Sequence, residues 1–217
     1  MKIKGVIFDF NGTLFWDTTL HNKAWDIFLD RHSFELSDNE KNEKIHGKNN
    51  KDILNGLFQQ QLLQKDIDKF GKEKEKIYQE LCLKTKMQLA PGAVDFFNYL
   101  KEKNIPFVIA TASEIDNVDF YFEHLNLGAF FNKTEVIFNN GKIKSKPDPQ
   151  IFNNAMTVMG LSEKEILIFE DSISGIKAAE NANVAQIIIV NSNNDDYRNW
   201  SYQQIKNFAE VDKRLFE

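Results

Sequence analysis

The fold of this chain is predicted by one stretch near its start, Val6-Ile7-Phe8-Asp9-Phe10-Asn11-Gly12-Thr13-Leu14. Apolar, β-branched and aromatic residues run directly into Asp9, and Gly12 then ends the pattern, which predicts a buried strand that stops at a carboxylate. In open α/β sheets, ligands bind at the carboxyl ends of the strands, so an Asp at such an end can face a substrate. An Asp at a strand end can equally cap a turn. Asp9 alone therefore does not separate a functional role from a structural one.

Three later stretches change that balance: I-A-T-A-S at 109–113, S-K-P-D-P at 145–149 and I-F-E-D-S-I-S-G at 168–175. Together with D-F-N-G-T-L at 9–14 they resemble, in order and spacing, the four motifs of the haloacid dehalogenase-like hydrolase superfamily. The resemblance spans nearly the whole chain and is greatest for the branch that contains β-phosphoglucomutase and small-metabolite phosphatases. One position departs from the family pattern D-x-D-G-T, because the second acid is replaced by Asn11.

The predicted fold class is α/β: a doubly wound, parallel, five-stranded Rossmann-like core with an inserted small all-helical cap domain. Apolar residues at helical spacing in residues 16–88 predict a cap of about four helices, and residues 1–15 and 89–217 form the core. We expect strands near 106–112, 135–138, 166–170 and 186–190. We expect core helices near 92–103, 117–125, 148–159 and 172–182.

Three local predictions concern helix ends. Asp17 is expected to cap the first helix of the insertion. Asp148 is expected to be the N-cap of a helix whose first residue is Pro149. The segment from Tyr202 to Phe216 is expected to form a last helix.

Composition narrows the function. The chain has 217 residues, 27 basic and 32 acidic, a net charge of −5 and no dense basic patch, so neither nucleic acid nor a membrane is an expected partner. The only cysteine, Cys82, excludes an internal disulfide and a cysteine-based metal site, and we expect it to be packed. The four histidines lack the spacing of zinc ligands. No signal segment or apolar run of ~20 residues is present, so we expect a cytoplasmic protein, and we expect a monomer.

The resemblance implies a magnesium site. A carboxylate and a phosphate dianion repel each other, so a cation must lie between them before the carboxylate can attack, and Mg²⁺ prefers oxygen ligands. By matching family positions, the ligands would be the side chains of Asp9 and Asp171 and the main-chain carbonyl of Asn11. Glu170 would lie in or just outside this ligand set.

The resemblance also implies the groups that would hold the phosphate. Thr111 would supply a hydroxyl, Ala112 a backbone N–H, and Lys146 a fixed positive charge. Asp9 would attack in line to form an aspartyl-phosphate. In the cap, sugar-phosphate mutases carry a G-x-S-R loop where this chain has Gly47-Lys48-Asn49-Asn50-Lys51. The expected Arg is therefore absent, and Lys48 or Lys51 is the candidate to replace it as a point charge, without its bidentate geometry. Gly47, Lys48 and Lys51 are the candidate substrate-binding residues of this loop.

Asn11 limits the chemistry, because an amide neither protonates a departing alkoxide nor accepts a proton from water. General acid–base help is typically worth ~10²–10⁴ in rate. Three consequences remain open: a phosphatase for leaving groups that need little protonation, an enzyme assisted by another group such as one from the cap, or a non-catalytic phosphate-ligand binder. On these grounds Asn11→Asp is expected to speed the hydrolysis of alkyl phosphates more than that of aryl or acyl phosphates.

The function predicted from the sequence is Mg²⁺-dependent hydrolysis of a small phosphorylated metabolite, with Asp9 as nucleophile. Two alternatives stay open. A sugar-phosphate mutase is disfavoured by Asn11 and by the missing Arg, and a low-activity or non-catalytic binder would keep the same residues for affinity alone.

Overall fold

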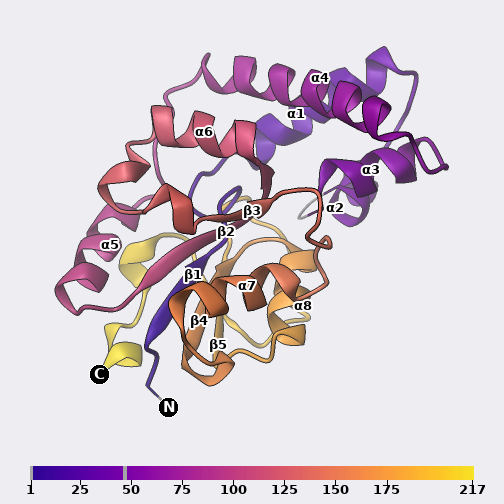
Figure 1. Ribbon diagram of the computed structural model, residues 1–217. Helices are drawn as coiled ribbons and strands as arrows, with labels where there is room; N and C mark the ends of the chain where they lie inside the picture. The colour runs from indigo at the N-terminus through magenta and orange to yellow at the C-terminus, as the bar shows by residue number, and fades with distance from the viewer. Residues whose placement is uncertain (1, 46–47) are drawn as a thin grey trace.

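The computed structural model describes residues 2–45 and 48–217, and one parallel sheet forms the centre of the molecule (Figure 1). The strands lie in the order β3-β2-β1-β4-β5-β6. Their bounds are β1 Gly5–Phe8, β2 Phe107–Glu114, β3 Ile137–Asn139, β4 Ile166–Glu170, β5 Gln186–Val190 and β6 Gln203–Ile205. The chain adds β2 and β3 on one side of β1 and the later strands on the other. The sheet therefore has its switch point between β1 and β4, where ligands bind in folds of this type.

Helices cover both faces of the sheet, as the alternation of patterns predicted. These are α5 Ala93–Glu102, α6 Ile115–His124, α7 Gln150–Met159 and α8 Ile173–Asn181. Because side chains alternate along a strand, Phe8 packs in the cluster that includes α5 and α6, and Ile7 packs in the cluster that includes α7 and α8. Phe8 is stacked on Phe169 at 5.2 Å between ring centroids and meets Phe97 edge-on at 5.4 Å.

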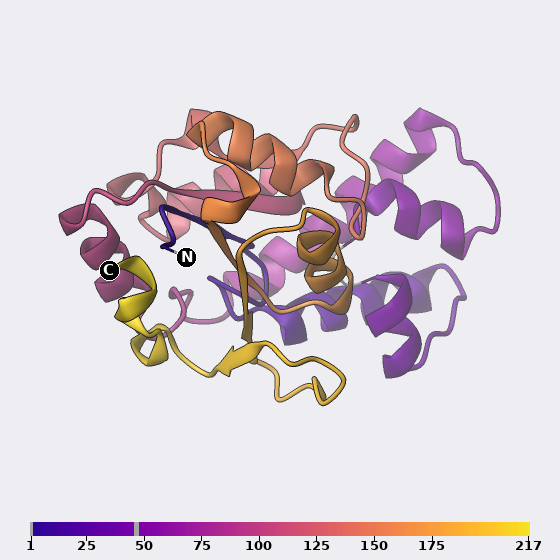
Figure 2. The ribbon, with the colours of Figure 1, turned by 90° about the horizontal axis from the view of Figure 1, so that it is seen from below.

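A helical unit, defined here as residues 18–82, is inserted between β1 and α5. It contains α1 Thr18–Arg31, α2 Asp38–Lys44, α3 Asn50–Leu57 and α4 Gln64–Cys82. The buried apolar residues of α1 and α4 include Trp25, Phe28 and Ile77, which hold the two helices together. The unit stands at the end of the molecule opposite both chain termini, as the two views show (Figures 1 and 2). Its boundaries as a separate cap domain, residues 16–88, remain a prediction.

The predicted last helix is wrong. The segment from Tyr202 begins with strand β6, which pairs parallel to β5 with Ile188 opposite Gln203, so the sheet has six strands rather than five. Two 3₁₀ helices follow, Phe208–Glu210 and Lys213–Phe216. The strand satisfies backbone groups that would otherwise be unpaired along the edge of β5. The apolar residues Ile205, Phe208, Val211 and Phe216 of this segment pack onto the existing core.

Helix α7 begins one residue later than predicted. Pro149 is its N-cap and Gln150 its first residue, while Asp148 accepts a hydrogen bond from the Gln150 N–H at 3.0 Å.

Cys82 is buried, and that burial raises the pKa of its thiol to about 12, which agrees with a packed role. None of the helices among the described residues combines the length and the apolar composition needed to cross a bilayer.

Candidate active site

Asp9, Lys146 and Glu170 meet at the carboxyl ends of β1 and β4. Asp9 follows β1 directly, and its N–H donates to the Phe169 carbonyl, which continues the pairing of the two strands. Lys146 Nζ donates to Asp9 Oδ1 at 2.6 Å and to Glu170 Oε1 at 2.5 Å. All three side chains are almost completely buried. The ammonium group of Lys146 therefore joins Asp9, 137 positions earlier in the sequence, to Glu170, 24 positions later.

Helix α8 fixes the two neighbouring acids at the end of β4. Ser172 is its N-cap and accepts from the Gly175 N–H, while Glu170 Oε2 accepts from the Ser172 N–H at 2.6 Å. Asp171 Oδ1 accepts from the Thr13 hydroxyl at 3.2 Å. Gly12 has a φ of 78°, and a side chain there would collide with the Asp171 carboxylate. The absence of a side chain at Gly12 therefore allows residues 9–14 to lie close to the Asp171 carboxylate.

The carboxylates of Asp9, Glu170 and Asp171 offer ligand atoms within 4.8 Å of one another. Burial raises the pKa of Asp9 to about 7, against the opposing effect of Lys146. Burial and then repulsion from Glu170 raise the pKa of Asp171. Burial opposes the charge on Lys146, but Asp9 and Glu170 outweigh it and raise its pKa. Three acids around one ammonium group leave an excess of negative charge, which a divalent cation bound by oxygen ligands would offset.

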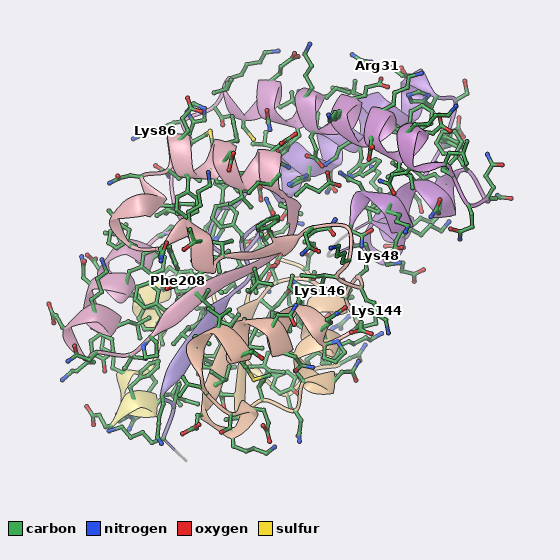
Figure 3. All side chains as sticks on the ribbon, in the orientation of Figure 1. Arg31, Lys48, Lys86, Lys144, Lys146 and Phe208 are labelled. Carbon is green, nitrogen blue, oxygen red and sulfur yellow. The ribbon has the colours of Figure 1, made fainter. Side chains whose placement is uncertain are left out.

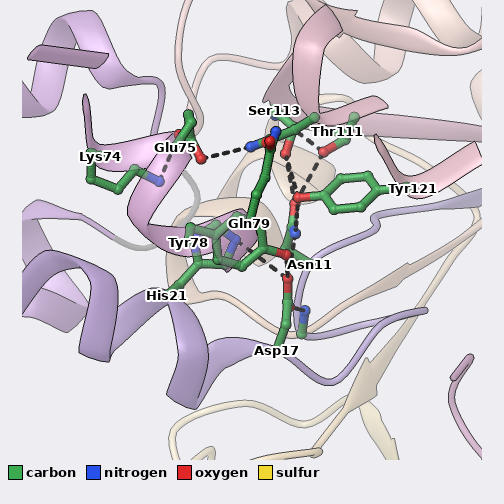
Figure 4. Close-up of polar contacts among 12 residues, drawn as sticks. Asn11, Asp17, His21, Lys74, Glu75, Tyr78, Gln79, Thr111, Ser113 and Tyr121 are labelled. Carbon is green, nitrogen blue, oxygen red and sulfur yellow. Dashed lines mark hydrogen bonds and ion pairs between the residues drawn. The ribbon is translucent and has the colours of Figure 1, made fainter. Parts of the chain in front are cut away.

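Residues at the end of β2 hold the side chain of Asn11 (Figure 4). The Ser113 hydroxyl donates to Asn11 Oδ1 at 2.8 Å, and the Thr111 hydroxyl donates to the same atom at 3.4 Å. Thr111 Oγ1 also accepts from the Ser113 N–H at 3.1 Å. Thr111 and Ala112 are thus close to Asn11, as the motif order implied. Ser113 is a contact that the sequence reading did not identify.

Asp17 is the N-cap residue of helix α1, as predicted, but its side chain makes no capping hydrogen bond. Its carboxylate is fully buried and turns back to the first motif, where it accepts from Asn11 Nδ2 at 2.7 Å and from the Gly12 N–H at 2.9 Å. The Tyr78 hydroxyl of α4 donates to the same carboxylate. The physical reason is that these donors are buried and need an acceptor, whereas the N–H groups of the first turn of an exposed helix can bond to water.

A cavity of about 100 Å³ lies between the acidic cluster and the helical unit. The core contributes Asp9, Asn11, Ala112, Ser113, Glu114, Asp171 and Ser172 to its lining, and the helical unit with the turn before it contributes Asp17, Thr18, His21, Trp25, Ile45, Lys48, Asn50, Ile53, Lys74 and Glu75. Lys48 therefore lines the predicted site where the helical unit meets the core (Figure 3), and the N–H of its neighbour Asn49 donates to Ser145 Oγ at 3.0 Å. Lys51 is exposed and lines a different cavity beside the loop 139–149. Gly47 lies outside the described residues.

The model of the haloacid dehalogenase-like hydrolase family matches residues 3–183. This chain belongs to that family. A phosphorylated carbohydrates phosphatase of Thermotoga maritima is 24% identical over 89% of the chain and 88% of its own length. A β-phosphoglucomutase of Bacillus subtilis is 25% identical over 83% of the chain and 80% of its own length. A crystal structure of a HAD hydrolase, family IA, variant 3, from Entamoeba histolytica superposes with a TM-score of 0.86 at 32% identity, covering 99% of this chain and 97% of that one.

The family match confirms the resemblance, the parallel Rossmann-like α/β fold, which has six strands instead of the five predicted, and the assignment of the chain as an enzyme, a HAD-like phosphatase. It also accounts for the order of the four motifs along the chain. The individual roles of the site residues and the identity of the metal remain predictions, and we take them up as proposals.

Proposed function

We propose that this protein hydrolyses monophosphate esters of small metabolites in two steps, through an aspartyl-phosphate on Asp9. The observation that supports this best is the pair of contacts from Lys146 to Asp9 and Glu170, together with the position of Asp9 in the lining of a small cavity. A buried carboxylate at a strand end, held by a lysine and open to a cavity on one side, is suited to act as a nucleophile. The four-motif order of the family supports the same assignment.

Mg²⁺ fits the donor set, because the set offers carboxylate oxygens and contains no sulfur or imidazole. Asp9, Asp171 and the main-chain carbonyl of Asn11 would hold it, with Glu170 nearby. When bound, the ion supplies positive charge that offsets the repulsion between a carboxylate and a phosphoryl group. Asn11 would use its main-chain oxygen here, so the amide side chain is compatible with metal binding.

The phosphoryl oxygens would be bound by the Thr111 hydroxyl, the Ala112 N–H and the Lys146 ammonium group. These donors come from rigid elements, since Thr111 lies within β2 and Lys146 is almost completely buried. Donors fixed before the reaction stabilise the charge that develops in the transition state without reorganisation. Asp9 would then attack the phosphorus, and water would later cleave the aspartyl-phosphate.

The size of the cavity supports a small substrate. Its volume of about 100 Å³ leaves space for only a few water-sized groups beyond the bound phosphate. The relative that is named a phosphatase of phosphorylated carbohydrates makes sugar or polyol monophosphates the first substrates to test. A mutase is less well supported, because residue 11 would have to activate sugar hydroxyls in both directions.

The test is steady-state hydrolysis of p-nitrophenyl phosphate and of a panel of sugar and polyol phosphates, with Mg²⁺ and with a chelator. We expect turnover that requires Mg²⁺ and that is abolished in Asp9→Asn, which preserves shape but removes the nucleophilic oxygen. The matched control is Asp95→Asn, since Asp95 is exposed in the first turn of α5. Activity in Asp9→Asn above background would exclude Asp9 as the nucleophile. No turnover of any ester, together with binding of Mg²⁺ and phosphate, would favour the non-catalytic binder.

A further inference from the structure

The side chain of Asn11 is fully committed to hydrogen bonds within the protein (Figure 4). Its Nδ2 donates to Asp17 Oδ2 at 2.7 Å and to the Tyr121 hydroxyl at 2.8 Å. Its Oδ1 accepts from Ser113 and Thr111. An amide held in this way supplies no proton to a leaving group. If alkyl phosphates are substrates, the proton must come from another group that lines the cavity.

Most ionisable groups contributed by the helical unit are already paired. Lys74 Nζ lies 2.6 Å from Glu75 Oε1. Glu75 also accepts from Asn50 Nδ2 at 2.9 Å and from Asn117 Nδ2 at 2.7 Å, and the pKa of Glu75 is held below its usual value because these contacts outweigh its burial. Glu75 therefore remains an anion with its oxygens occupied and is a poor proton donor.

His21, on α1, differs from these groups. Its Nε2 is buried and has no hydrogen bond of acceptable geometry among residues 2–45 and 48–217, yet it lies 3.3 Å from Asp17 Oδ2. The imidazole is stacked on the Tyr78 ring at 3.9 Å between centroids, which fixes its plane. The ring lines the cavity. Asp17 Oδ2 is thus shared by the imidazole and by the Asn11 amide, so His21 lies one group away from residue 11.

We propose that His21 is the general acid and base of this site in place of residue 11, with Asp17 as the residue that positions it. This inference rests on the proposed phosphatase function. The carboxylate of Asp17 lies 3.3 Å from the ring and the Tyr78 ring is stacked on it, so the position of the imidazole in the cavity is fixed by both neighbours. Asp17 faces Nε2 of the ring, which leaves Nδ1 to exchange a proton with the substrate.

His21 loses one proton in the first step of the reaction and regains one in the second. In the first step, the bond from Asp9 to phosphorus forms, the bond from phosphorus to the leaving oxygen breaks, and the imidazolium of His21 gives its proton to that oxygen. In the second step, the neutral imidazole takes a proton from water as the water oxygen attacks phosphorus and the bond to Asp9 breaks. The products are an alcohol and inorganic phosphate, and His21 is again an imidazolium.

The experiment compares the protein with His21→Ala on an alkyl phosphate, such as a hexitol phosphate, and on p-nitrophenyl phosphate, both with Mg²⁺. The nitrophenolate leaves without a proton, so only the alkyl ester depends on an acid. We expect kcat for the alkyl ester to fall by about 10²-fold or more in His21→Ala, with little change for the aryl ester. Imidazole added to the assay should restore part of the alkyl-ester turnover, which a purely structural loss would not allow.

Two matched variants and one backup complete the design. His32→Ala removes another half-buried histidine of the helical unit, which contacts Glu73 and does not line the cavity. Glu114→Gln removes the other carboxylic acid of the cavity that is a candidate donor, because burial and Glu75 raise its pKa. His21→Asn keeps a polar side chain if His21→Ala does not fold.

Equal losses on both esters without rescue by imidazole would overturn the proposal, as would a selective loss on the alkyl ester in Glu114→Gln or His32→Ala. No turnover of either ester by the unchanged protein would instead contradict the proposed function. The two failures are therefore distinguishable.

Discussion

At the scale of the residue, the Asn11 amide is matched to the buried carboxylate of Asp17, since the two side chains are 2.7 Å apart. Asn11→Asp would place two carboxylates at that distance, and they would share one proton because both cannot remain ionised. The shared proton raises the pKa of the pair in the folded state, so the loss of stability should be present at pH 8 and small at pH 5. We expect about 1–3 kcal/mol at pH 8, the range for a buried polar group that loses its partner, measured by urea unfolding.

The double variant Asn11→Asp with Asp17→Asn restores one amide and one carboxylate and should recover most of that loss. Equal destabilisation at both pH values would show that repulsion is not the cause. In the single variant Asn11→Asp, the proton that the new carboxylate shares with Asp17 is also one that an alkoxide can take. The expected gain on alkyl phosphates should therefore be largest at the lower pH.

At the scale of the element, helix α8 is packed against the end of β4 so closely that only glycine fits at position 175. A Cβ there would collide with the Glu170 carboxylate, which Lys146 and Ser172 hold in place. We expect Gly175→Ala to lower stability by about 1–3 kcal/mol, as overpacking does, and to weaken metal-dependent turnover. Gly56→Ala in α3 is the control, because no atom lies within 4 Å of the added Cβ and Ala favours a helix interior. A thermal melt in which both variants behave alike would refute the steric argument.

At the scale of the whole molecule, polar contacts join the helical unit to the sheet, and Glu114 at the end of β2 is one of them. Its Oε1 accepts from Asn50 Nδ2 of α3 at 3.5 Å, and burial and then repulsion from Glu75 of α4 raise its pKa above the ordinary 4.5. Folding therefore favours its protonated form, so its contribution to stability is lost as pH rises through the folded pKa. Glu114→Gln should raise the urea midpoint at pH 7.5 and leave it nearly unchanged below pH 4.5. Glu123→Gln, on the exposed face of α6, should show neither effect. A lower midpoint for Glu114→Gln at pH 7.5 would contradict this account.

The sequence by itself determined the alternation of strands and helices, the helical insertion and the four motifs, because side-chain periodicity and turn residues are local signals. It also predicted that Asp9 and the acid pair at 170–171 would meet, since the carboxyl ends of parallel strands lie at one edge of a sheet. Lys146 was expected there only because the S-K-P-D-P stretch resembles the family motif.

The tertiary structure alone decided which groups surround Asn11. Its contacts with Ser113 and Tyr121 join residues 102 and 110 positions apart. The side chain of Asp17, the N-cap residue of α1, accepts from Asn11, Gly12 and Tyr78 instead of capping the helix. The last segment became β6 for a related reason, because the edge of β5 needed partners that no local pattern in residues 202–216 records. A periodic pattern of residues indicates which face of a segment is apolar. The hydrogen-bond partner of a buried polar group depends instead on how segments distant in the sequence pack together.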